Sequence, residues 1–135
     1  MGEAQPKRVL IVEDNYWTAM YLADVFAEAG YTAIGPCHSY TAALQILADS
    51  IPQCAVIDLD LGGPADVPLG TEGERLLSIL ETGGAGILVH SGVTQRFELL
   101  RRYYPDCVFL SKPASPAQLL HALDGFPAAG NVGSS

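Results

Sequence analysis

Mostly apolar residues form four short runs along the chain, and each run ends at polar or charged residues. The runs cover residues 9–12, 55–57, 87–90 and 108–111. Short apolar runs bounded by polar or turn residues predict strands buried on both faces of a parallel sheet. A weaker run over residues 32–35 predicts one more short strand, which we expect Pro36 to break because proline lacks the backbone donor.

A period of about 3.6 residues in the segments between the strands predicts helices. Several of these helices carry start or stop signals in the sequence. The signals are a cap at Asn15 with a left-handed end at Gly30, a cap at Ser39, a capping box of Thr71 and Glu74, and a cap at Ser115 with an end at Gly125. We expect the first helix to run to about Ala29, and another helix to run from about Thr94 to Tyr104.

Five strands and five helices in strict alternation predict a doubly wound α/β domain. We expect this domain to cover residues 7–126, after an N-terminal arm of residues 1–6. Residues 59–70 are rich in glycine, proline and aspartate and predict a loop. Residues 127–135 are small and polar and predict a disordered tail.

The composition narrows the class of protein. The chain has 135 residues, 49% of them hydrophobic, which is enough for one core. A net charge of −8 argues against unaided binding to nucleic acids or anionic membranes. No apolar stretch approaches the ~20 residues of a membrane span, and no apolar signal region precedes the first strand, so we expect a cytoplasmic protein. Cys37, Cys54 and Cys107 lack metal or redox spacing, which favours idle thiols.

The residues at the strand ends carry the candidate chemistry. Glu13 and Asp14 follow the first run, Asp58 follows the run 55–57, Ser91 follows the run 87–90, and Lys112 follows the run 108–111. The carboxyl ends of parallel strands meet at one edge of an open sheet, where ligands bind. We therefore expect three carboxylates, a hydroxyl and an ammonium group to converge there.

Four motifs in this order resemble the receiver domain of response regulators in two-component signalling. The motifs are residues 9–15, residues 55–63, the pair Ser91-Gly92 and the pair Lys112-Pro113. Together they cover nearly the whole predicted domain. The resemblance implies a flavodoxin-like fold with a five-stranded parallel sheet, of the stand-alone, single-domain type found in bacteria.

The resemblance also implies a role for each acidic residue. Asp58 would accept a phosphoryl group from a histidine kinase or a histidine phosphotransfer protein. A carboxylate that attacks an anionic phosphoryl group meets charge repulsion, so a cation is needed, and Mg²⁺ suits a few carboxylates together with water and phosphate oxygens. Asp14 and Asp58 would hold Mg²⁺ directly, Glu13 through a water molecule, and Asp60 through its backbone carbonyl.

The remaining motifs would receive the product and report it. Lys112 would neutralise one phosphate oxygen, and Ser91 would donate its hydroxyl to another. The backbone amides near Leu59, Asp60 and Gly92 would complete the anion site. The Lys112–Pro113 bond is expected to be cis, as in the family. Ser91 and Phe109 would form a switch that changes the surface of the fourth helix for an unknown downstream protein; alternatively, Phe109 is ordinary core.

Two helical surfaces have alternative interpretations. Trp17, Met20 and Tyr21 lie off the inner stripe of the first helix, so either the last helix covers them or they form a docking face for a kinase or a second copy. On the fourth helix, Arg96, Arg101 and Arg102 form either an output patch or a solvated basic face.

Two other functions compete with the phosphoacceptor. Asp58 and Asp60 form a D-x-D pair that resembles the nucleophile and general acid of haloacid-dehalogenase-type phosphatases. The chain would otherwise be a receiver that is never phosphorylated and acts only by binding proteins. In the main interpretation it is not an enzyme beyond its own phosphorylation and dephosphorylation.

Overall fold

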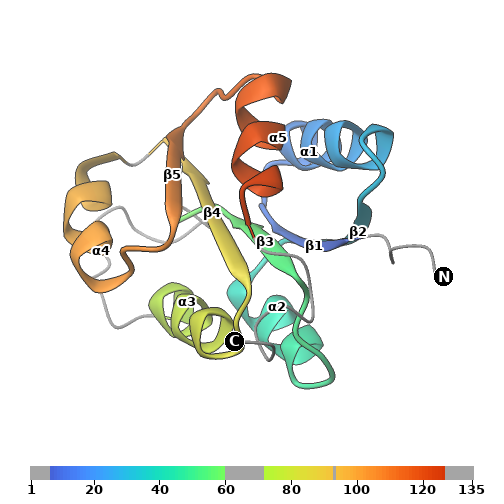
Figure 1. The fold of residues 1–135 in the computed structure, drawn as a ribbon. Helices are drawn as coiled ribbons and strands as arrows, with labels where there is room; N and C mark the ends of the chain where they lie inside the picture. The colour runs from blue at the N-terminus through green and yellow to red at the C-terminus, as the bar shows by residue number, and fades with distance from the viewer. Residues whose placement is uncertain (1–6, 60–71, 93, 127–135) are drawn as a thin grey trace, which may run out of the picture.

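The computed structural model describes residues 7–59, 72–92 and 94–126, which form alternating strands and helices. The strands are β1 (Arg8–Val12), β2 (Thr32–Cys37), β3 (Cys54–Ile57), β4 (Gly86–Ser91) and β5 (Val108–Ser111). The helices are α1 (Tyr16–Glu28), α2 (Tyr40–Leu47), α3 (Glu72–Thr82), the 3₁₀ turn η1 (Thr94–Arg96), α4 (Phe97–Tyr103) and α5 (Pro116–Asp124). Figure 1 shows this succession of elements along the chain.

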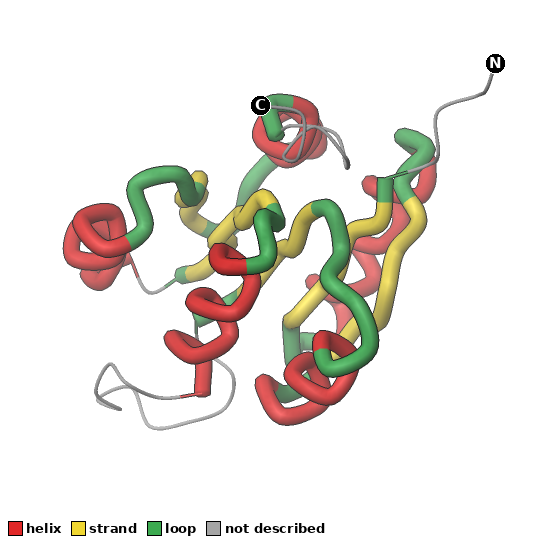
Figure 2. The backbone as a smooth tube through the Cα atoms, turned by 60° about the horizontal axis from the view of Figure 1, so that its bottom comes forward, coloured by secondary structure: helices red, strands yellow, loops and turns green. Residues whose placement is uncertain are grey.

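The five strands form one parallel sheet in the order β2-β1-β3-β4-β5. Helices α1 and α5 cover one face of the sheet, and α2, α3 and α4 lie on the other face (Figures 1 and 2). The order reverses direction between β1 and β3, so the carboxyl ends of these two strands form the crevice where doubly wound folds bind ligands. The predicted fold, flavodoxin-like with five strands and five helices, is confirmed.

Alternation of side chains along each strand divides the core into two clusters. Leu10 and Val12 of β1 point into the cluster under α2, α3 and α4, whereas Val9 and Ile11 point into the cluster under α1 and α5. All four side chains are fully buried because helices cover both faces. This double coverage explains why the strands read as continuous apolar runs.

The described helix ends confirm the predicted signals. Asn15 Oδ1 accepts a hydrogen bond from the Thr18 amide at 2.9 Å, Ser39 caps α2, and Ser115 forms a capping box with Gln118 at the start of α5. Gly30 has a φ of +93°, the left-handed conformation expected after α1. The predicted capping box at Thr71, most of the 59–70 loop, the N-terminal arm and the C-terminal tail lie outside the described residues.

One predicted boundary is wrong. Pro36 does not end β2, which continues to Cys37. The strand tolerates proline because β2 is at the edge of the sheet, and because the pairing slips there: Leu10 is opposite Ile34 but Val12 is opposite Cys37, so β2 holds one extra residue. The predicted helix from about Thr94 to Tyr104 is present: it begins as the 3₁₀ turn η1 and continues as an α-helix from Phe97 to Tyr103.

Among the described residues, no helix combines the length and the apolar character needed to cross a membrane. The three cysteines are all unpaired thiols, as predicted. Burial raises the pKa of the Cys54 thiol to about 12, and burial together with the charges of Glu81 and Asp106 does the same for Cys107. These thiols are therefore protonated at neutral pH.

Candidate functional site

Three carboxylates meet at the carboxyl edge of the sheet. Glu13 and Asp14 follow β1, Asp58 follows β3, and one oxygen from each lies within 4.8 Å of the others. Val12 of β1 pairs with Ile57 of β3, and this register brings the two strand ends together. Glu13 and Asp58 are only 1% and 3% exposed, whereas Asp14 is exposed to solvent. The sequence therefore predicted this cluster correctly.

Lys112 reaches into the cluster from the segment that follows β5. Its Nζ lies 2.9 Å from Glu13 Oε1 and 3.0 Å from Asp58 Oδ2. Its backbone amide donates to the Ser91 carbonyl at 3.0 Å, which fixes this segment to the end of β4. The Lys112–Pro113 peptide bond is cis, as predicted. One ammonium group thus bridges two buried carboxylates from different strands.

Burial and charge shift the protonation of this group of residues. Burial raises the pKa of Glu13, with the charge of Asp58 adding to it and the hydrogen bond from Lys112 opposing it. Burial acts to lower the pKa of Lys112, but its hydrogen bonds to Glu13 and Asp58 outweigh burial and the pKa is raised. Lys112 is therefore protonated at neutral pH, and the carboxylates of Glu13 and Asp58 hold its ammonium group.

The end of β4 provides the hydroxyl of Ser91 and an exposed backbone at Gly92. Ser91 is fully buried, whereas Gly92 is exposed and a Cβ added to it would meet nothing within 4 Å. The amides of Leu59 and Gly92 donate no hydrogen bond to any described residue. Amides at successive strand ends are suited to bind an anion. The predicted carbonyl ligand of Asp60 lies outside the described residues.

Three residues near the site were not predicted to contribute. The Tyr40 hydroxyl donates to the backbone carbonyl of Asp58 at 2.9 Å, and His38 Nδ1 lies 3.1 Å from the backbone carbonyl of Glu13. His90 is 2% exposed, and neither ring nitrogen has a hydrogen-bond partner among the described residues. Contacts to backbone carbonyls leave no signal in a sequence; for His90, the signal was a histidine within an apolar strand.

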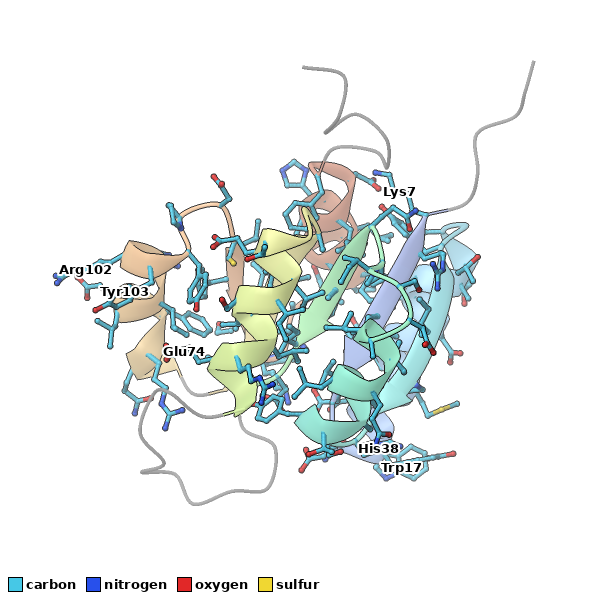
Figure 3. The ribbon with its side chains drawn as sticks, turned by 90° about the horizontal axis from the view of Figure 1, so that it is seen from below. Lys7, Trp17, His38, Glu74, Arg102 and Tyr103 are labelled. Atoms are coloured by element: carbon cyan, nitrogen blue, oxygen red, sulfur yellow. The ribbon has the colours of Figure 1, made fainter. Side chains whose placement is uncertain are left out.

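Phe109 lies beside the fourth helix, as the predicted switch requires. Its ring is 8% exposed and its centroid lies 5.3 Å from that of Phe97 at the start of α4. The guanidinium carbon of Arg101 lies 5.1 Å from the Phe109 centroid and 5.9 Å from that of Phe97. Arg102 and Tyr103 project away from the body of the molecule (Figure 3). The core position of Phe109 is thus clear, while its switching role stays a prediction.

The first helix presents aromatic side chains to solvent beside the acidic cluster. Trp17 is 78% exposed and Tyr16 is 58% exposed, and their rings form an edge-to-face pair 5.1 Å apart. Tyr21 differs, because its hydroxyl donates to the Ala114 carbonyl just before α5. Trp17 and His38 project at the same end of the molecule (Figure 3). Cover by the last helix is therefore wrong for Trp17.

Comparisons with known proteins connect this fold to receiver domains. Neither a protein-family model nor a curated protein matches the sequence. The structure is similar to a response regulator receiver protein from Sinorhizobium medicae WSM419 (TM-score 0.73, 20% identity, 89% of this chain and 93% of that chain). It is also similar to a CheY-like receiver domain protein from Methanospirillum hungatei JF-1 (0.72, 19%, 89% and 92%). A third similar structure is the PhyR response regulator REC domain of Erythrobacter litoralis (0.69, 24%, 92% and 96%).

These likenesses extend over about nine-tenths of the chain, at low sequence identity. The chain therefore has the fold of a receiver domain.

Proposed function

We propose that this protein is a phosphoacceptor receiver that takes a phosphoryl group on Asp58. The observation that carries the proposal is the position of Asp58, whose buried carboxylate faces Lys112 Nζ at 3.0 Å within a cluster of acids. A buried carboxylate at a strand end, paired with a cation, is arranged to react with a group that is itself anionic. A carboxylate that only faces solvent in a turn would need neither this burial nor this pairing with a cation.

The residues present fit a divalent cation. Three carboxylates (Glu13, Asp14 and Asp58) against one ammonium (Lys112) leave two formal negative charges in the cluster. Asp14 and Asp58 would hold Mg²⁺ directly, Glu13 through water, and Asp60 through its carbonyl. When bound, the cation neutralises charge on the transferring phosphoryl group.

The proposed step is an in-line transfer. A carboxylate oxygen of Asp58 attacks the phosphorus of a phosphohistidine on the kinase or phosphotransfer protein. The new P–O bond forms as the P–N bond breaks, and the bonding electrons return to the imidazole. Lys112, the hydroxyl of Ser91, and the amides of Leu59 and Gly92 then hold the phosphoryl oxygens of the acyl phosphate.

The partner surfaces follow from the exposed side chains. Tyr16, Trp17 and Met20 are exposed on α1, close to the acidic cluster in the chain, and form our proposed docking face for the phosphodonor. On the other side, Ser91 and Phe109 would couple the acyl phosphate to α4, which then binds a downstream protein.

The test is covalent labelling with a small phosphodonor, such as acetyl phosphate, in the presence of Mg²⁺. Intact-mass measurement should show one added phosphoryl group in the native protein and in Asp49→Asn, an exposed control, and none in Asp58→Asn. Labelling that persists in Asp58→Asn would place the nucleophile elsewhere. Catalytic turnover of a generic phosphate ester would favour the phosphatase, and a lack of any response to Mg²⁺ with beryllofluoride would favour a pure binding module.

A further inference from the structure

The segment from Cys37 to Tyr40 lies across the ends of both strands that carry the acids. The Cys37 carbonyl accepts from the Glu13 amide at 2.9 Å, and His38 Nδ1 meets the Glu13 carbonyl at 3.1 Å. Two residues later, the Tyr40 hydroxyl donates to the Asp58 carbonyl at 2.9 Å. One short connection between β2 and α2 therefore contacts the backbone of Glu13 after β1 and of Asp58 after β3.

The extra residue in β2 carries the chain into this position. Gly35 has a φ of +93°, and a Cβ on it would lie 2.7 Å from the Cys37 amide nitrogen and 3.1 Å from the Ile11 carbonyl oxygen. Any other residue would be strained and crowded there. Ser39 then caps α2 by accepting from the Ala42 amide at 3.1 Å, so Tyr40 is held as the first residue of a capped helix.

The Tyr40 contact constrains more than the carbonyl that it touches. A peptide unit is planar, and in the trans form the carbonyl oxygen and the following N–H point in opposite directions. When Tyr40 holds the Asp58 oxygen on the α2 side, the Leu59 N–H is directed away from α2. That amide donates to no described residue.

We propose that Tyr40 is a positioning residue for the phosphoryl group, because its hydroxyl fixes the Asp58–Leu59 peptide so that the Leu59 amide is aimed at the anion. This inference rests on the proposed function and adds a part to it. The hydrogen bond from Tyr40 goes to the backbone carbonyl of Asp58, so we expect its effect to fall on the anion more than on the cation.

The inference predicts a split between two affinities. Tyr40→Phe removes only the hydroxyl and keeps the ring. We expect it to weaken beryllofluoride binding in the presence of saturating Mg²⁺ by about tenfold, the effect of one hydrogen bond, and to slow labelling by acetyl phosphate by a similar factor. The affinity for Mg²⁺ alone should change less than about twofold by the same reasoning. We expect Trp17 fluorescence to report both ligands, because Trp17 follows Asp14 by three residues.

The matched control is Tyr31→Phe. The Tyr31 hydroxyl also makes a tertiary hydrogen bond, to Asp124 in the last turn of α5 at 2.5 Å, and this bond lies away from the acidic cluster. It should lower the thermal midpoint without changing either affinity. Beryllofluoride binding by Tyr40→Phe within about threefold of the native protein, or an equal loss in Tyr31→Phe, would overturn the inference.

Failure of this inference is distinguishable from failure of the proposed function. If the native protein is labelled and Asp58→Asn is not, while Tyr40→Phe behaves as the native protein does, the phosphoacceptor stands and the positioning role falls. If the native protein binds no beryllofluoride with Mg²⁺, both fall together.

Discussion

Helices α1 and α4 cover opposite faces of the same sheet, and they are held very differently. Helix α1 has 13 residues, a side-chain cap at Asn15 and three buried residues, Ala19, Leu22 and Phe26. Helix α4 has seven residues, an N-cap without a side-chain hydrogen bond and two buried residues, Phe97 and Leu100. Elements with few buried contacts open at a lower free energy than the rest of a domain.

Under the proposed function, this difference separates the site of phosphorylation from the surface that responds to it. The acids stand beside the firmly held helix α1, where precise distances between carboxylates and Lys112 can be maintained. Phe109 lies under the weakly held helix α4, which a small change beneath it can move. The proposed function needs both properties, because phosphorylation at a rigid site has to change a surface that a partner binds.

Truncating the main buried leucine of each helix is expected to give the largest effect. Leu22→Ala should lower the free energy of unfolding by about 3 kcal/mol, because a cavity forms in a well-packed cluster. Leu100→Ala should cost only about 1–2 kcal/mol, because α4 can unfold locally and let the site collapse. Urea denaturation measures both values.

Both leucines are 1% exposed, so their burial is matched. Hydrogen exchange provides the second measurement: in Leu100→Ala, the amides of α4 should exchange much faster while those of β1 keep their protection. Equal destabilisation by the two variants, with uniform exchange, would show that α4 is held as firmly as α1.

His90 provides a second test of this comparison. It lies in β4, within the sheet that separates α1 from α4. Burial, with help from the charge of Lys112 and against that of Asp58, lowers its pKa from 6.5 to about 4. Between these values the unfolded chain binds a proton that the folded chain does not. Stability is therefore complete above pH 6.5 and is lost as the pH falls towards 4. Linkage gives a loss of about 2 kcal/mol between pH 7 and pH 5.

The matched variant is His90→Leu, which fills the same apolar position without a titrating group. We expect its unfolding free energy to depend less on pH over this range than that of the native protein. Parallel pH profiles for the two proteins would mean that His90 is protonated in the folded state as readily as in the unfolded chain.

The smallest expected effect concerns Arg101. Its guanidinium lies over both Phe97 and Phe109, whereas Arg102 makes no such contact in the described structure. Arg101→Met should lower stability by about 0.5–1 kcal/mol, the range for an exposed cation–π contact. Arg102→Met should change it by less than about 0.5 kcal/mol, as surface substitutions do. The ring proton shifts of Phe109 should move only in Arg101→Met, and movement in both variants would remove the distinction.

The sequence was sufficient for the features that depend on strand ends and helix signals. The double burial of β1 and β3 appears directly as apolar runs, and parallel strands bring Asp14, Asp58 and Lys112 to one edge whatever their distance in the chain. The caps at Asn15 and Ser115 act over three residues, so their signals are local.

What the sequence missed depends on contacts between distant segments. Tyr40 reads as one apolar residue of an amphipathic helix, and only the tertiary structure shows its hydroxyl at the Asp58 carbonyl. Pro36 reads as a strand breaker because the sequence does not show that β2 is an edge strand with an extra residue. The weak attachment of α4 also depends on how few of its residues reach the core.

The same extra residue in β2 has a consequence for the behaviour of the protein at high concentration. An open sheet has two edges, here β2 and β5, and a long, regular edge would recruit strands from other molecules into aggregates. Strand β2 is irregular, because it holds an extra residue and contains Pro36, which has no N–H to offer, and β5 is only four residues long. Neither edge gives a neighbouring molecule a continuous ladder of backbone groups to extend.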